Sequence, residues 1–147
     1  MEFTCTPPLW AIWAFAKFGK PEEAYRVVQG ISPIMNGMEP DLWSAEPFVT
    51  PGNIDGPDSP NYGRAGWTWY TGSASWYQKV FVDWILGVRA EDEGLMIDPV
   101  IPSVWDGFKI KDFTEVLFTI SKSLIRSMYR LVLRRLRLTD SKILTIP

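Results

Sequence analysis

The chain has 147 residues, 46% of them hydrophobic, which is enough to bury one core and excludes a disordered tail. It has no histidine and a single cysteine, Cys5, which disfavours metal hydrolases, histidine-dependent triads and disulfide scaffolds. The formal charge of −2 is unevenly divided, because residues 1–110 carry 7 basic and 14 acidic side chains and residues 111–147 carry 8 and 3. Without a signal peptide or an apolar run of roughly 20 residues, we expect a cytoplasmic protein that binds no metal.

The first two predicted elements form a helical hairpin. A strongly apolar stretch at residues 9–18 ends at Gly19, which is typical of a buried helix. Pro21 suits the first position of a second helix, in which residues 22–28 supply an acidic start and an apolar face before Gly30.

The next stretch, residues 32–66, is rich in Pro, Gly, Asn and Asp, which predicts a loop with one extended piece at residues 47–50. Connections of this length inside compact domains are usually functional or disordered. Aromatic residues interleaved through and just beyond the stretch argue against disorder: Trp43, Phe48, Tyr62, Trp67, Trp69 and Tyr70. We therefore interpret it as the wall of a binding site.

A third helix is predicted where Trp76, Val80 and Trp84 recur at four-residue spacing, with Gly87 as its stop. Beyond it, the acidic run at residues 91–93 is interpreted as a solvated turn. Short strands are predicted at residues 95–98 and 108–110, among prolines.

The start of the third helix is a candidate anion site. Thr71-Gly72-Ser73 offers hydroxyl groups and a glycine backbone that a ligand can approach closely. The free N–H groups and the dipole of a first helical turn attract anions, so phosphate would fit there. The alternative, which is the commoner outcome for such residues, is that Thr71 or Ser73 simply caps the helix.

Four blocks follow one another along the chain: Ala-Glu-Pro-Phe-Val at 45–49, Gly-Arg-Ala-Gly-Trp-Thr-Trp-Tyr-Thr-Gly-Ser-Ala at 63–74, Trp-Ile-Leu-Gly-Val-Arg at 84–89 and Ile-Asp-Pro-Val-Ile-Pro at 97–102. In sequence and order they resemble glycoside hydrolase family 94, which includes cellobiose, cellodextrin, chitobiose and laminaribiose phosphorylases and part of the cyclic glucan synthases. With the helical hairpin, the resemblance covers residues 8–110.

The resemblance implies a mainly α fold: the last hairpins of an (α/α)6 barrel that holds the sugar at its centre, running into a small β domain. It implies an inverting phosphorylase that acts on a β-linked disaccharide or oligosaccharide with inorganic phosphate as co-substrate and releases a sugar 1-phosphate. Full-length members are expected to be homodimers that bind neither nucleic acid nor membrane.

The resemblance also assigns site residues. Thr71 and Gly72, with Ser73 in the same turn, would hold phosphate. Residues expected at the sugar are Glu46, Arg64, Trp67 and Trp69. A buried ion pair is about as plausible a role for Glu46 and Arg64, and core packing is a somewhat commoner one for each Trp.

Two departures from the family pattern matter. Its general-acid aspartate lies upstream of anything in this chain, so we assign no catalytic residue and expect the chain alone to be inactive. A histidine among the phosphate ligands is also missing, and residues 32–37 offer only the Asn36 amide in that loop. The alternative function is a carbohydrate-binding or interaction module without catalysis.

Residues 111–147 differ from the rest and are predicted to form a basic amphipathic helix, with apolar residues from Leu124 to Leu138 among five arginines. It could lie on an anionic membrane, bind nucleic acid, or be sequence read out of frame, and we favour the last. We thus divide the chain into the end of the barrel (1–90), the start of the β domain (91–110) and this basic tail (111–147).

Overall fold

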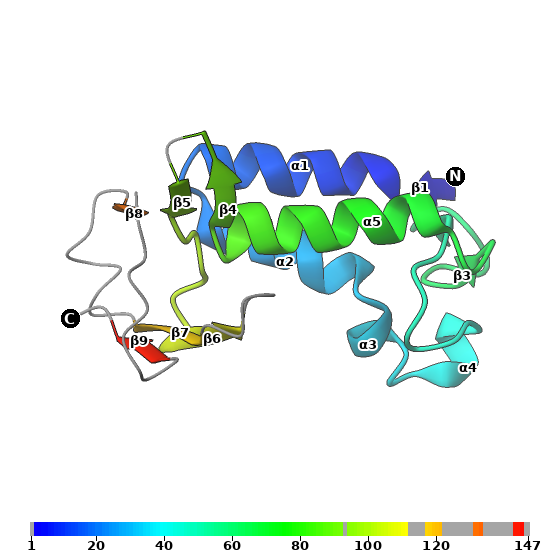
Figure 1. The fold of residues 1–147 in the computed structure, drawn as a ribbon. Coiled ribbons are helices and arrows are strands. Elements are labelled where there is room, and N and C mark those ends of the chain that lie inside the picture. Colours follow the sequence, from blue (N-terminus) through cyan, green and yellow to red (C-terminus); the bar gives the residue numbers. More distant parts are fainter. Residues whose placement is uncertain (1, 93, 112–116, 122–130, 134–142, 146–147) are drawn as a thin grey trace.

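The computed structural model shows three long helices flanked by short strands (Figure 1). It describes residues 2–92, 94–111, 117–121, 131–133 and 143–145, with side chains at 5–92, 95–110 and 120. The helices are α1 (Thr6–Lys17), α2 (Pro21–Ile31) and α5 (Thr71–Val80), the last continuing as the π-helix η1 (Phe81–Ile85). The fold is therefore mixed, mostly helical with a few short strands.

The predicted helical hairpin is confirmed. Both helices begin with proline in the first turn, where a missing N–H costs nothing, and Gly19 turns between them at φ 63°. The second helix differs from the prediction at its end, because it continues through Gly30 to Ile31. A Cβ at Gly30 would meet no atom within 4 Å, so nothing in the surroundings requires a break there.

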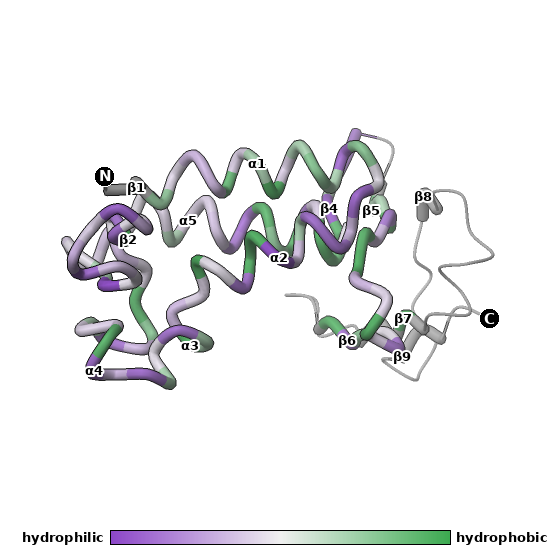
Figure 2. The backbone as a smooth tube through the Cα atoms, turned by 180° about the vertical axis from the view of Figure 1, so that it is seen from behind, coloured by the Kyte–Doolittle hydropathy of each residue, from purple (hydrophilic) through white to green (hydrophobic). Residues whose placement is uncertain are grey.

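The core lies where α1, α2 and α5 face one another, and hydrophobic segments recur along all three helices (Figure 2). Leu9 and Ile12 of α1 and Ile85 of η1 are each no more than 1% exposed. Burying a side chain of this size contributes about 1.5–3 kcal/mol. Cys5 is also buried, and burial raises the pKa of its thiol to about 11.

The segment between α2 and α5 is more structured than predicted. It contains two short helices and two strands: α3 (Pro33–Asn36), α4 (Pro40–Trp43), β2 (Asn53–Asp55) and β3 (Ala65–Gly66). With β1 (Glu2–Thr4), the strands form an antiparallel sheet in the order β1-β2-β3. The extended piece predicted at residues 47–50 is wrong, because these residues form a turn and the pairing begins at Asn53.

At the other end of the helices lies an antiparallel hairpin of β4 (Val88–Glu91) and β5 (Gly94–Ile97). Arg89 anchors it: its guanidinium lies 4.5 Å from the Trp84 ring centroid, and its Nη1 donates to the Asp83 carbonyl at 3.1 Å. The predicted strands at residues 95–98 and 108–110 are confirmed as β5 and β6 (Gly107–Lys111).

In the tail, the structure describes three strands: β7 (Leu117–Ser121), β8 (Leu131–Leu133) and β9 (Ile143–Thr145). β8 pairs with β5, and β7 pairs with β6 and, in parallel, with β9. The predicted tail helix is therefore wrong at residues 117–121, 131–133 and 143–145, where hydrogen bonds between paired strands replace helical ones. Residues 112–116, 122–130, 134–142 and 146–147 lie outside the described part of the chain.

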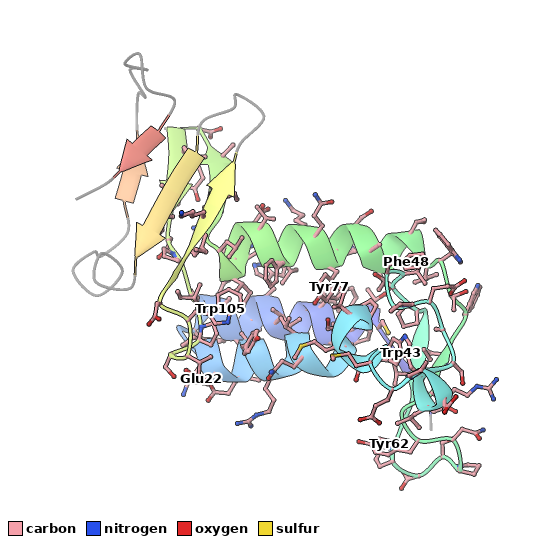
Figure 3. The ribbon with its side chains drawn as sticks, turned by 90° about the horizontal axis from the view of Figure 1, so that it is seen from below. Glu22, Trp43, Phe48, Tyr62, Tyr77 and Trp105 are labelled. Atoms are coloured by element: carbon pink, nitrogen blue, oxygen red, sulfur yellow. The ribbon has the colours of Figure 1, made fainter. Side chains whose placement is uncertain are left out.

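A junction joins the approach to β6 to the helices (Figure 3). The Trp105 ring lies 5.3 Å from Tyr25 and 6.3 Å from Phe81, and Ser103 N donates to Glu22 Oε1 at 2.6 Å. Among the described residues, each helix is too short or too polar to cross a bilayer.

Candidate functional site

The N-terminus of α5 is open to solvent. Its N-cap is Tyr70, no side chain caps the helix, and Ala74 N donates to Tyr70 O at 3.1 Å. The backbone N–H groups of residues 71–73 precede this first helical bond and therefore have no acceptor within the helix. Thr71 and Gly72 are exposed, and a Cβ at Gly72 would meet no atom within 4 Å. The interpretation of this motif as a side-chain cap is wrong.

Ser73 differs from its two neighbours. Its side chain is 0% exposed, and its Oγ lies 3.3 Å from Thr6 Oγ1 on α1. The hydroxyl therefore ties α5 to the start of α1, and only the backbone N–H of Ser73 belongs to the open turn. A phosphate role for Thr71, Gly72 and Ser73 stays a prediction.

Glu46 is hydrogen-bonded to a tryptophan that precedes this turn by two residues. Trp69 Nε1 donates to Glu46 Oε1 at 3.1 Å, across 23 residues of sequence. The pKa of the Glu46 carboxyl is lowered, first by its own backbone N–H, then by the Trp69 indole and the Thr68 hydroxyl. The carboxylate is thus ionised at neutral pH and accepts rather than donates hydrogen bonds.

Trp67 and Trp69 have left-handed backbones, with φ of 49° and 62°. This conformation costs a non-glycine residue on the order of 1–3 kcal/mol, and such strain clusters at functional sites. Both rings face solvent, at 78% and 63% exposed. Each has an aromatic neighbour, Tyr70 at 5.7 Å from Trp67 and Phe48 at 6.2 Å from Trp69.

Backbone bonds fix this aromatic segment against the short sheet. Gly52 N lies 2.9 Å from Trp67 O, Gly52 O accepts from Cys5 N at 2.9 Å, and Tyr70 N donates to Thr50 O at 3.1 Å. A Cβ on Gly52 would approach Trp67 Cβ to 3.2 Å, so the small residue permits the close packing. The positions of the aromatic rings therefore depend on residues 50–52, which precede them by about fifteen positions.

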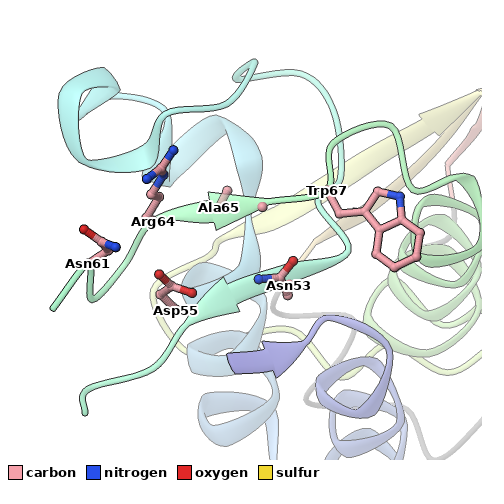
Figure 4. Close-up of a pocket in the computed structure, with 7 residues that line it drawn as sticks. Asn53, Asp55, Asn61, Arg64, Ala65 and Trp67 are labelled. Atoms are coloured by element: carbon pink, nitrogen blue, oxygen red, sulfur yellow. The ribbon is translucent and has the colours of Figure 1, made fainter. Parts of the chain in front are cut away.

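A polar pocket of about 400 Å³ lies over the paired strands β2 and β3 (Figure 4). Its walls include Asn53, Asp55, Asn61, Arg64, Gly66 and Trp67. Arg64 and Trp67 were predicted at the sugar, and the structure brings them into one cavity. Glu46 and Trp69 are not part of its wall. Asn53, Asp55 and Asn61 were not predicted as site residues. They lie in the loop that the sequence predicted to be a site wall, and their amide and carboxylate side chains were the available signal.

The alternative roles of the predicted sugar residues can now be compared with the structure. Within the described part of the chain, neither Glu46 nor Arg64 forms an ion pair. The exposure of Trp67 and Trp69 excludes core packing for both. A contact of these four residues with sugar stays a prediction.

Exposed flat rings beside amide, carboxylate and guanidinium groups are a composition suited to carbohydrate, which has apolar ring faces and many hydroxyl groups. The sequence model of the glycosyl hydrolase 94 superfamily catalytic domain matches residues 2–87, more than half of the chain. The chain therefore belongs to this superfamily.

Curated relatives agree with this assignment. The chain is 38% identical over 102 residues to the cyclic beta-(1,2)-glucan synthase NdvB of Rhizobium meliloti, covering 67% of the chain and 4% of that protein. It is 34% identical over 104 residues to the N,N'-diacetylchitobiose phosphorylase of Vibrio furnissii, covering 71% of the chain and 13% of the enzyme. A 3-O-beta-D-glucopyranosyl-beta-D-glucuronide phosphorylase of Paenibacillus borealis is 28% identical over 108 residues, 73% of the chain and 14% of the enzyme. The chain thus spans a small part of each relative's length.

Proposed function

We propose that this chain forms the phosphate-binding and part of the sugar-binding side of an inverting glycoside phosphorylase. The substrate would be a β-linked disaccharide or oligosaccharide, and the product a sugar 1-phosphate. The observation that carries the proposal is the uncapped start of α5 at Thr71-Gly72, two residues after Trp69, which Glu46 binds. Groups suited to bind an anion and groups suited to bind a sugar are thereby found together at the start of α5.

In the reaction that this site would serve, a phosphate oxygen forms a bond to the anomeric carbon from the face opposite the glycosidic oxygen. The glycosidic bond breaks, and its electron pair and a proton from a carboxylic acid leave with the departing sugar. The Thr71 hydroxyl and the N–H groups of the first turn would orient the phosphate. We assign the acid to no residue of this chain and expect no turnover from the chain alone.

We further propose that α1, α2 and α5 belong to an (α/α)6 barrel. The outer face of α2 is polar, with Glu22 and Arg26 exposed, whereas α1 carries Trp10 at 52% exposed opposite its buried residues. A helix that is apolar on all sides is usually covered on all sides. The surface of α1 therefore suits contact with further helices of such a barrel.

The test is a tryptophan-fluorescence titration of the chain with cellobiose, N,N'-diacetylchitobiose and a β-1,2-linked glucose disaccharide, each with and without inorganic phosphate. We expect phosphate to tighten binding of one disaccharide on the order of fivefold or more, the usual size of coupling between sites. Thr71→Val, which keeps the shape without the hydroxyl, should reduce this coupling. Gln78→Ala, an exposed position two turns further along the same helix, should retain it.

A carbohydrate-binding module is the second candidate, favoured by the exposed Trp67 and Trp69 rings. It predicts saturable sugar binding with an affinity that phosphate leaves unchanged. That outcome, with Thr71→Val behaving like the unmodified chain, would replace the phosphorylase proposal.

A further inference from the structure

We infer that the pocket over the paired strands β2 and β3 binds a neutral sugar unit beyond the bond that is cleaved, so that the substrates are oligosaccharides of at least three units. This inference rests on the proposed function. It adds Asn53, Asp55 and Asn61 to the sugar-binding residues and selects among the substrates that the proposed function allows.

The position of the pocket is the first argument. Attack requires phosphate and the anomeric carbon within about 3–3.5 Å, which places the reacting bond at the start of α5. In Figure 4 the Trp67 ring lies at one end of the strand pair, while Asn61 and Arg64 lie at the other. Three extended residues from Trp67 to Arg64 span roughly 10 Å. The far end of the pocket is therefore separated from the reacting bond.

The second argument is the chemistry of the walls. A sugar hydroxyl both donates and accepts, and the pocket supplies an acceptor in Asp55, a donor in Arg64 and both in Asn61. Its volume of about 400 Å³ falls within the usual range of small-molecule sites. The negative charge of Asp55 and the positive charge of Arg64 cancel, so the pocket has no net charge. A pocket without net charge favours a neutral sugar over a uronic acid or a sugar phosphate.

The third argument is that internal contacts hold the polar walls in place. Ser59 Oγ donates to Asp55 Oδ2 at 3.2 Å and accepts from Asn61 N at 3.1 Å. Gly66 leaves room for Asn53 in its present conformation, since a Cβ on residue 66 would come within 2.8 Å of Asn53 Oδ1. A cavity built in advance in this way loses little entropy when it binds a ligand.

The experiment compares disaccharide with trisaccharide in matched series: β-1,2-linked glucose units, cello-oligosaccharides and chito-oligosaccharides. Isothermal titration of the full chain in the presence of phosphate measures both affinities. In the series that binds, we expect the trisaccharide to bind on the order of tenfold more tightly, as one or two additional net hydrogen bonds provide. Asn61→Ala should bring the trisaccharide-to-disaccharide ratio close to one.

Asp58→Asn, on the same loop and outside the pocket wall, is the matched control and should retain the ratio of the unmodified chain. Equal affinities for disaccharide and trisaccharide, with phosphate coupling intact, would overturn the inference and leave the proposed function standing. A preference for trisaccharide that Asn61→Ala leaves unchanged would also overturn it. Absence of binding in every series would contradict the inference and the proposed function together.

Discussion

The helical unit and the segment that precedes α5 use aromatic and apolar residues in opposite ways. In α1 and η1, residues such as Leu9 and Ile85 are almost completely buried and lie in regular helices, an α-helix and a π-helix. In residues 44–70, the Trp67 and Trp69 rings face solvent on left-handed backbones, and Ser44 is left-handed as well. Hydrophobic burial stabilises the helical unit, whereas in residues 44–70 a strained backbone holds aromatic side chains exposed to solvent.

This difference indicates where stability and binding reside. Apolar surface removed from water dominates folding free energy, so substitutions in the helices should reduce stability. Exposed rings on a strained loop contribute little burial, and strain of this kind persists only where the surroundings enforce it. Substitutions in the loop should therefore act mainly on ligand binding.

The largest effect should follow from a cavity in the helical unit. Leu9→Ala removes a side chain that is 1% exposed, and we expect the free energy of unfolding to fall by about 2–5 kcal/mol. Phe18→Ala, at a position 79% exposed, should change it by less than about 0.5 kcal/mol. Urea unfolding followed by circular dichroism measures both. Equal losses would break the comparison between buried and exposed apolar residues.

Two glycines, Gly87 and Gly30, allow the effect of a strained backbone on stability to be compared with that of an ordinary helical one. Gly87 has φ 67°, and a Cβ there would lie 2.0 Å from the Asp98 carbonyl oxygen. Gly87→Ala should therefore destabilise the chain by about 2–4 kcal/mol, from left-handed backbone strain and overpacking. Gly30→Ala, inside α2 with open space around it, should instead stabilise by up to about 1 kcal/mol. Thermal unfolding of the two variants should shift in opposite directions.

The smallest effect concerns the Glu46–Trp69 bond. Because the folded-state pKa of Glu46 is lowered, its contribution is present above the unfolded pKa of about 4.3 and is lost as pH falls through the folded pKa. Trp69 fluorescence should therefore change on acidification from pH 7 to pH 3. The change in fluorescence should be smaller in Glu46→Gln and in Trp69→Phe. If the curves of Glu46→Gln and the unmodified chain coincide, the fluorescence change does not arise from ionisation of Glu46.

Local pattern was sufficient for much of the fold. The helical hairpin, the third helix and its stop at Gly87 follow from apolar spacing and from glycine, because helical neighbours lie three or four residues apart in sequence. The position of the phosphate candidate at the start of α5 follows for the same reason. The continuation of α2 through Gly30 did not follow, since helix propensity is a weak prior that packing overrides.

The pairing of β2 with β3 joins residues about twelve positions apart, and short strands in a glycine- and proline-rich segment carry little period of their own. The inward turn of Ser73 depends on Thr6, which is 67 residues away. The pocket formed by Asp55, Asn61 and Arg64 likewise exists only once that sheet is assembled.

The sequence by itself determined the three long helices and the blocks that identify the family, because these depend on residue type and short spacing. Tertiary structure alone decided which side chains meet at the site. The Glu46–Trp69 bond spans 23 residues of irregular chain, and no local preference specifies such a contact. It forms because the backbone bonds of residues 50–52 to the segment 66–70 bring the two side chains together.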